Sequence, residues 1–160
     1  MTPGGRAASI WALLGVGLLL GSAVLRLGAR GIATIASGLT PLEWLLLVAL
    51  TVAFVYGEGV VTLERRWVPK VLGRARSLAR EPRLVLRLLA PLYGLSLVGA
   101  PPLRMLRAWA GTTAILVAVL VVRSFPEPWR GIVDFAVAAA LAWALLTIVR
   151  RAPRALRPEG

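Results

Sequence analysis

The chain has 160 residues, about the length of one domain, and 58% of them are hydrophobic, which exceeds what a water-soluble fold of this size buries. It carries 19 Lys and Arg residues against seven Asp and Glu, a formal charge of +12, so its expected partner is an anionic surface such as a membrane or a nucleic acid. Cysteine and histidine are both absent, which excludes disulfides, thiol nucleophiles, Cys or His zinc sites and Ser-His-Asp triads.

Four apolar stretches are long enough to cross a bilayer, for which about 20 helical residues are needed. They are residues 7–25, 44–63, 103–123 and 131–149. The third reaches this length only if the arginines near its ends extend their charged groups to the interfaces. The second contains one ionisable residue, Glu58, and the fourth contains Asp134 in its first turn. We therefore predict an all-α, polytopic membrane protein in which residues 1–160 form a single membrane domain.

The first stretch has a second interpretation. Arg6, an apolar run and the small residues Gly21, Ser22 and Ala23 together resemble a secretory signal peptide. The run is longer than the 7–15 residues of a signal core, and further apolar stretches follow it. Both features favour a retained span.

A fifth apolar segment, residues 88–102, is interrupted by three prolines and two glycines. A straight helix through it would lose backbone hydrogen bonds that lipid cannot replace. We therefore expect a re-entrant or interfacial segment that does not cross the bilayer.

The distribution of basic residues predicts the orientation. With four spans, 15 of the 19 Lys and Arg residues lie on the side of both termini, including those of the tail, residues 150–160. With five spans the two sides carry ten and eight, and Arg87 lies inside the membrane. The four-span arrangement is favoured, with both termini in the cytoplasm and the chain in the cytoplasmic (inner) membrane.

Residues 68–80, between the second and third stretches, have apolar side chains at helical spacing within an arc of about 120°. The opposite arc of this segment and the residues that precede it in the chain carry basic side chains: Arg65, Arg66, Lys70, Arg74, Arg76 and Arg80. We predict an amphipathic helix that lies on the membrane surface and contacts the headgroups of anionic lipids. The alternative is a loop that is basic only to fix the topology. Nucleic-acid binding is disfavoured, because no interleaved aromatic residues or recognition motif accompany the charge.

Glu58 is the sharpest candidate for a polar site inside the membrane, where an acid needs water, a partner or a function. It lies in Tyr56-Gly57-Glu58-Gly59, so close backbone approach and a nearby hydroxyl are both available. Alternatively, Glu58 is an interfacial acid that is neutralised by Arg87. On the other side of the membrane, mutual ion pairing is expected between two sets of similar size: Arg26, Arg30, Arg123 and Arg130, and Glu43, Glu127 and Asp134.

Small residues repeat four apart in three of the spans, a spacing that lets helices approach closely in lipid. They are Gly17 and Gly21 in the first span, Ala110, Ala114 and Ala118 in the third, and Ala136, Ala140 and Ala144 in the fourth. We predict a tight antiparallel hairpin between the third and fourth spans.

Few polar groups lie within the spans, so we expect a non-enzymatic accessory or scaffold subunit of a larger membrane assembly, as a homo-oligomer or with other chains, and no cofactor. A small transporter or proton or ion channel that uses Glu58 is the first alternative. An enzyme acting on phosphorylated lipid is the second, disfavoured because a second acid at the same depth is missing.

Overall fold

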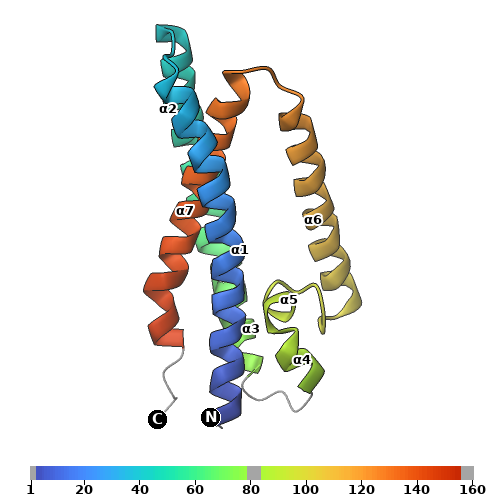
Figure 1. The fold of residues 1–160 in the computed structure, drawn as a ribbon. Coiled ribbons are helices and arrows are strands. Elements are labelled where there is room, and N and C mark those ends of the chain that lie inside the picture. Colours follow the sequence, from blue (N-terminus) through green and yellow to red (C-terminus); the bar gives the residue numbers. More distant parts are fainter. Residues whose placement is uncertain (1–2, 79–83, 156–160) are drawn as a thin grey trace.

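A computed structural model describes residues 3–78 and 84–155, and the described part is built from helices (Figure 1). In chain order these are α1 (Pro3–Ala36), α2 (Pro41–Phe54), the π-helix η1 (Val55–Trp67), α3 (Val68–Leu78), α4 (Leu84–Leu88), α5 (Ala90–Gly94), α6 (Pro102–Arg123) and α7 (Trp129–Ala155). The all-α prediction is confirmed.

Four helical segments are long and apolar enough to cross a membrane: Ala7–Ala36, Pro41–Leu78, Pro102–Arg123 and Trp129–Pro153. The chain is thus a multi-pass membrane protein by length and composition, as predicted. Helix α1 continues past Arg26 and Arg30 and ends just before Gly38, whose φ of +90° suits glycine. Helix α2 then begins with a capping box, in which the Thr40 and Glu43 side chains each bond to the backbone of the other residue.

The second apolar segment and the basic segment after it form one continuous helical rod rather than two separate helices. Helix α2 runs into η1 and η1 into α3, over 38 residues. The change of hydrogen-bond pattern after Trp67 places Pro69 in the first turn of α3, where a missing N–H is tolerated. Pro69 therefore does not interrupt the helical rod.

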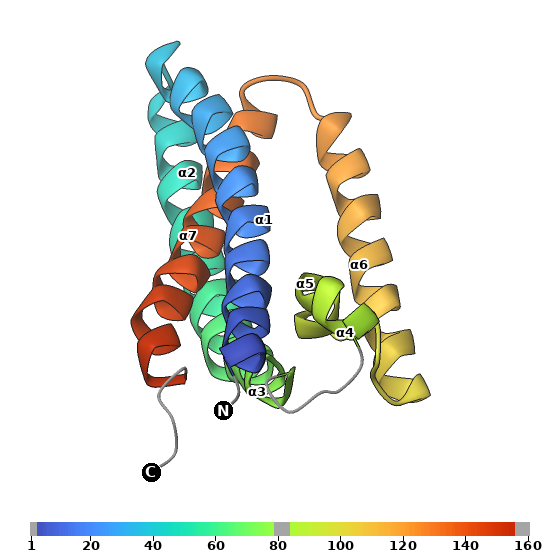
Figure 2. The same ribbon diagram turned by 60° about the horizontal axis from the view of Figure 1, so that its bottom comes forward.

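Helix α7 packs against α1, α2 and η1, and α1 in turn contacts α3 and α5. Helix α1 begins and α7 ends at the same end of the bundle, which we call the terminal end, while α2 and α7 begin at the opposite, loop end (Figures 1 and 2). The described ends of the chain therefore lie on one side, as an even number of crossings requires.

Glycines bring α1 and α7 into close contact. A Cβ at Gly31 would lie 2.6 Å from the Phe135 Cβ, and one at Gly28 would lie 3.9 Å from the Ala138 Cβ. The predicted packing glycines, Gly17 and Gly21, face Leu145 at 3.8 and 3.9 Å. The alanine row of α7, Ala136, Ala140 and Ala144, is fully buried.

Helix α6 lies apart from the packed helices, as both ribbon views show. None of its residues is buried, and Ala110, Ala114 and Ala118 are all exposed. The predicted hairpin between the third and fourth spans is therefore wrong within this chain. The physical reason is that the alanine row of α7 is already covered by α1, α2 and η1.

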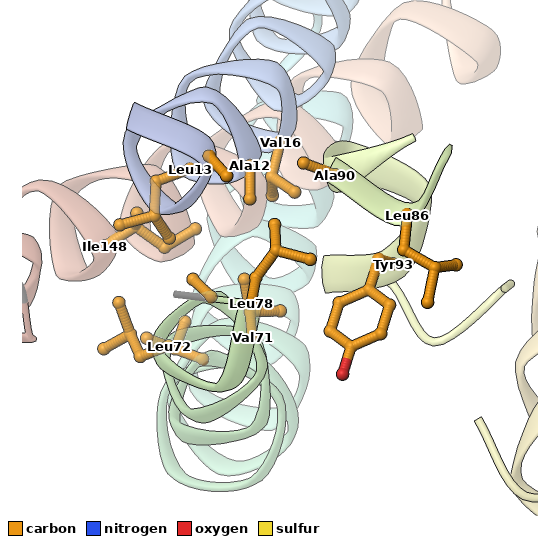
Figure 3. Close-up of a cluster of buried hydrophobic side chains, with 13 residues drawn as sticks. Ala12, Leu13, Val16, Val71, Leu72, Leu78, Leu86, Ala90, Tyr93 and Ile148 are labelled. Carbon is orange, nitrogen blue, oxygen red and sulfur yellow. The ribbon is translucent and has the colours of Figure 1, made fainter. Parts of the chain in front are cut away.

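A cluster of buried hydrophobic side chains lies where α1, α3, α5 and α7 meet (Figure 3). Its α3 members, Val68, Val71, Leu72, Ala75 and Leu78, are at most 9% exposed. They pack against a second set from the other helices: Ala12, Leu13 and Val16 of α1, Ala90 and Tyr93 of α5, and Ile148 of α7. The predicted helix forms, but protein rather than lipid covers its apolar face.

Residues 88–102 contain no helix long enough to cross a membrane. They fold back against the side of α1 and against α3, and Pro91 occupies the space that a side chain at Gly15 would need. Ser96 and Gly99 both have φ near +64° and turn the chain toward α6. The segment is therefore a packed cap at the terminal end of the bundle.

Candidate functional site

Glu58 and Tyr56 lie on the outer surface of η1 rather than among the helices. The Tyr56 side chain is 64% exposed, and the Glu58 carboxylate makes no hydrogen bond or ion pair with any side chain that the structure describes. The side chain of Arg87 lies outside the described residues, so its pairing with Glu58 stays a prediction. On the inner side of η1, Gly59 contacts Ala140 and Trp143 of α7.

The wide turns of η1 were not anticipated. In this segment the backbone bonds span five residues, and the Thr62 hydroxyl donates to the Gly57 carbonyl oxygen at 3.0 Å. Stretches of π-helix are frequent at functional positions because they reorient side chains. The two glycines around Glu58 were the available signal, since glycine weakens regular α-helix.

Glu64 organises a second polar cluster, at the terminal end of η1. Its Oε1 accepts a hydrogen bond from Arg151 Nη2 at 2.8 Å, and its Oε2 accepts one from Trp143 Nε1 at 2.7 Å. The carboxylate is 23% exposed and the arginine side chain 43% exposed. Both carboxylate oxygens therefore have partners, and the guanidinium of Arg151 is held in a fixed position.

A groove opens beside this cluster, with a volume of about 420 Å³. Its lining residues, which define the α7 groove, are Glu64, Trp143, Leu146, Thr147, Arg150 and Arg151. Sequence reasoning did not find this groove, because Glu64 and Arg151 lie 87 positions apart in the chain. It combines two arginines, one neutralised acid and an aromatic ring, a set that can bind an anion but offers no general base free of partners.

A different cluster at the loop end confirms part of the expected ion pairing. Arg30 Nη1 lies 3.1 Å from Asp134 Oδ2, and the Asp134 side chain is 8% exposed. The Thr34 hydroxyl donates to Glu127 Oε2 at 3.3 Å. These contacts tie the end of α1 to the start of α7, which is a structural role.

Arg74, predicted to contact a lipid headgroup, is half-buried and makes several contacts within the chain. Its guanidinium lies 4.1 Å above the centre of the Tyr93 ring and donates to the backbone oxygens of Tyr93, Val98 and Gly99. The last two distances are 3.0 and 3.3 Å. Arg74 therefore fastens the cap segment to α3.

The headgroup contacts of the basic segment stay predictions. Arg65, Arg66, Lys70 and Arg76 are exposed, whereas Arg80 lies outside the described residues. In the parts of the chain that the structure describes, no three His, Cys, Asp or Glu side chains are grouped so that they could hold a metal ion.

We compared the chain with protein-family models, with curated proteins and with solved structures. None of the three comparisons finds a match.

Proposed function

We propose that this chain is a non-enzymatic structural subunit of a membrane assembly and that α6 joins it to its partner. The observation that supports this proposal is the exposure of α6, a 22-residue apolar helix without one buried residue. In lipid, helices associate through close packing and polar pairing rather than through exclusion of water. A spanning helix left outside its own bundle is available for such packing with another chain.

The two sides of α6 differ in exposure. Met105, Ala108 and Thr112 are half-buried and, at 100° per residue, lie on the side that faces the rest of the chain. Roughly opposite lies an exposed surface that we call the α6 face: Arg107, Ala110, Ala114 and Ala118. This face points away from the rest of its own chain, so another chain must cover it if it is covered by protein.

We infer that the partner is a second copy, because the same chain carries a complementary surface. This surface, the α2 face, consists of Ala49, Ala53, Gly57 and Glu58. The two alanines and Glu58 are exposed, and no atom lies within 4 Å of the position of a Cβ on Gly57. Helices α1 and α7 lie between α2 and α6 in both ribbon views, so the α6 face of a chain does not reach its own α2 face.

The two faces match in spacing and in charge. Helices α2 and α6 run in opposite directions, and their small residues share a four-residue period. An alignment that places Gly57 opposite Ala110 also opposes Ala53 with Ala114. In this alignment Arg107 and Glu58 differ in height by about 3 Å, within reach of an arginine side chain. An acid that is costly within an apolar span thereby gains a cation.

The position of Glu58 favours assembly over the alternatives. A transport or channel role requires the acid to face a water-filled path, whereas Glu58 lies on the outside of its own bundle and pairs with Arg107 in the proposed assembly. A lipid-modifying enzyme requires a free base or acid near its phosphate site, whereas both oxygens of Glu64 are already bonded.

The mass of the purified protein in mild detergent tests the proposal. We expect wild type to be an oligomer, Arg107→Glu and Glu58→Arg to dissociate it, and the double variant to restore it, because the charges are exchanged. The matched control, Arg123→Glu at the other end of α6, should remain oligomeric. A stoichiometric complex with a different protein would retain the subunit role and refute self-association. A wild-type monomer without any partner would refute both.

A further inference from the structure

We propose that the α7 groove binds the phosphate of an anionic phospholipid. This inference is independent of the assembly proposed above, because the groove lies between η1 and α7 and involves neither α6 nor the α2 face. Its volume of about 420 Å³ is in the range of small-ligand sites and accommodates a phospholipid headgroup.

The charge of the groove suits a phosphate. Arg150 and Arg151 carry two positive charges against one negative charge on Glu64, and exposed Arg65 and Arg66 directly follow Glu64 in the chain. Arginine donors form strong charge-assisted hydrogen bonds with phosphate oxygens. The surroundings of the groove therefore select a negatively charged headgroup over a zwitterionic one.

The hydrogen-bond donors of the groove are also preorganised for a phosphate. Glu64 holds one nitrogen of Arg151 at 2.8 Å, and the other N–H groups of that guanidinium have no partner among the described residues. The exposed Arg150 makes no hydrogen bond or ion pair within the same part of the chain. Because Glu64 already orients Arg151, the protein loses little conformational entropy when a phosphate binds between the two arginines.

The location of the groove favours a lipid over soluble phosphate. Arg150 directly follows the apolar run of α7, at the depth where headgroups begin. Leu146, which lines the groove and is 44% exposed, lies about one helical turn closer to the membrane centre than Arg150, and the neighbouring Val149 is 60% exposed. Acyl chains can lie against these apolar side chains while the phosphate contacts the arginines. Basic pockets at helix ends on the side rich in Lys and Arg are suited to anionic lipids.

Native mass spectrometry of the full chain, with equal amounts of phosphatidylglycerol and phosphatidylcholine of the same acyl length, tests the proposal. We expect wild type to retain phosphatidylglycerol preferentially and Arg150→Ala to lose about tenfold in affinity for it. Arg150→Lys should keep most of the affinity, because it keeps the charge. The matched control Arg123→Ala should behave as wild type. Thermal unfolding of each variant establishes that it is folded.

Three outcomes would overturn the assignment. The first is equal retention of both lipids by wild type. The second is an equal loss of affinity for phosphatidylglycerol in Arg150→Ala and Arg123→Ala. The third is an unchanged affinity for phosphatidylglycerol in Arg150→Ala. A separate experiment titrates inorganic phosphate without lipid and follows the unfolding temperature of the protein. Protection by millimolar inorganic phosphate equal to that given by phosphatidylglycerol would show a site for soluble phosphate and would refute the lipid assignment.

Discussion

At the scale of residues, charge alone does not indicate what an arginine does in this chain. Arg74 and Lys70 belong to the same basic segment, yet Lys70 is exposed whereas Arg74 crosses to the cap and bonds to three backbone oxygens. Sequence periodicity assigned both to the polar face of one helix. It could not show that α5 and the turn after it fold back onto that face, because this contact joins segments about 20 residues apart.

Replacing Arg74 with lysine tests its role in fastening the cap. Lysine keeps the charge but lacks the planar fork that reaches several carbonyls, so we expect a loss of about 1–3 kcal/mol in the free energy of unfolding. Lys70→Ala, at an exposed position, should change this energy by less than about 0.5 kcal/mol. Unfolding titrations in mixed micelles measure both. Equal stability of wild type and Arg74→Lys would contradict this role and would leave Arg74 as a predicted headgroup contact.

At the scale of elements, the sequence predicted which segments are helices better than it predicted their neighbours. Hydropathy and length located the four apolar helices, because both properties are local. The partner of α7 depends on which of several rows of small residues packs most closely against it, and alanines four apart do not distinguish α1 from α6. Three glycines carried the missing information. Gly28 and Gly31 face α7, and Gly131 faces Thr34 of α1.

Gly31→Ala tests the contact between α1 and α7. The added Cβ would lie 2.6 Å from the Cβ and 2.9 Å from the Cα of Phe135, so the backbone of α7 must move. Overpacking of this kind costs about 1–3 kcal/mol in the free energy of unfolding. The control is Gly73→Ala on α3, where no atom lies within 4 Å of the new Cβ and alanine should stabilise the helix by up to about 1 kcal/mol. If Gly31→Ala proved as stable as Gly73→Ala, the packing of α1 on α7 would be wrong.

At the scale of the whole molecule, the described ends of the chain lie at one end of the bundle, where most of the described Lys and Arg residues also lie (Figure 1). By the positive-inside rule we predict that this end faces the cytoplasm. Reporter fusions after Gly160 and within residues 125–128 should report opposite sides, with the first in the cytoplasm. Two fusions on the same side, or an external C-terminus, would contradict the four-span topology.

The most direct test of the assembly uses the absence of cysteine from the chain. Ala53→Cys in one copy and Ala114→Cys in a second copy with a different tag are expressed together and oxidised in the membrane. We predict a disulfide between the two tagged chains, because the proposed alignment places these positions opposite each other at a Cα separation that a disulfide can bridge. When Leu116→Cys, on another side of α6, is used instead of Ala114→Cys, it should not form this disulfide. Absence of the link between positions 53 and 114, or an equal yield with position 116, would contradict the docking of α6 on a second copy.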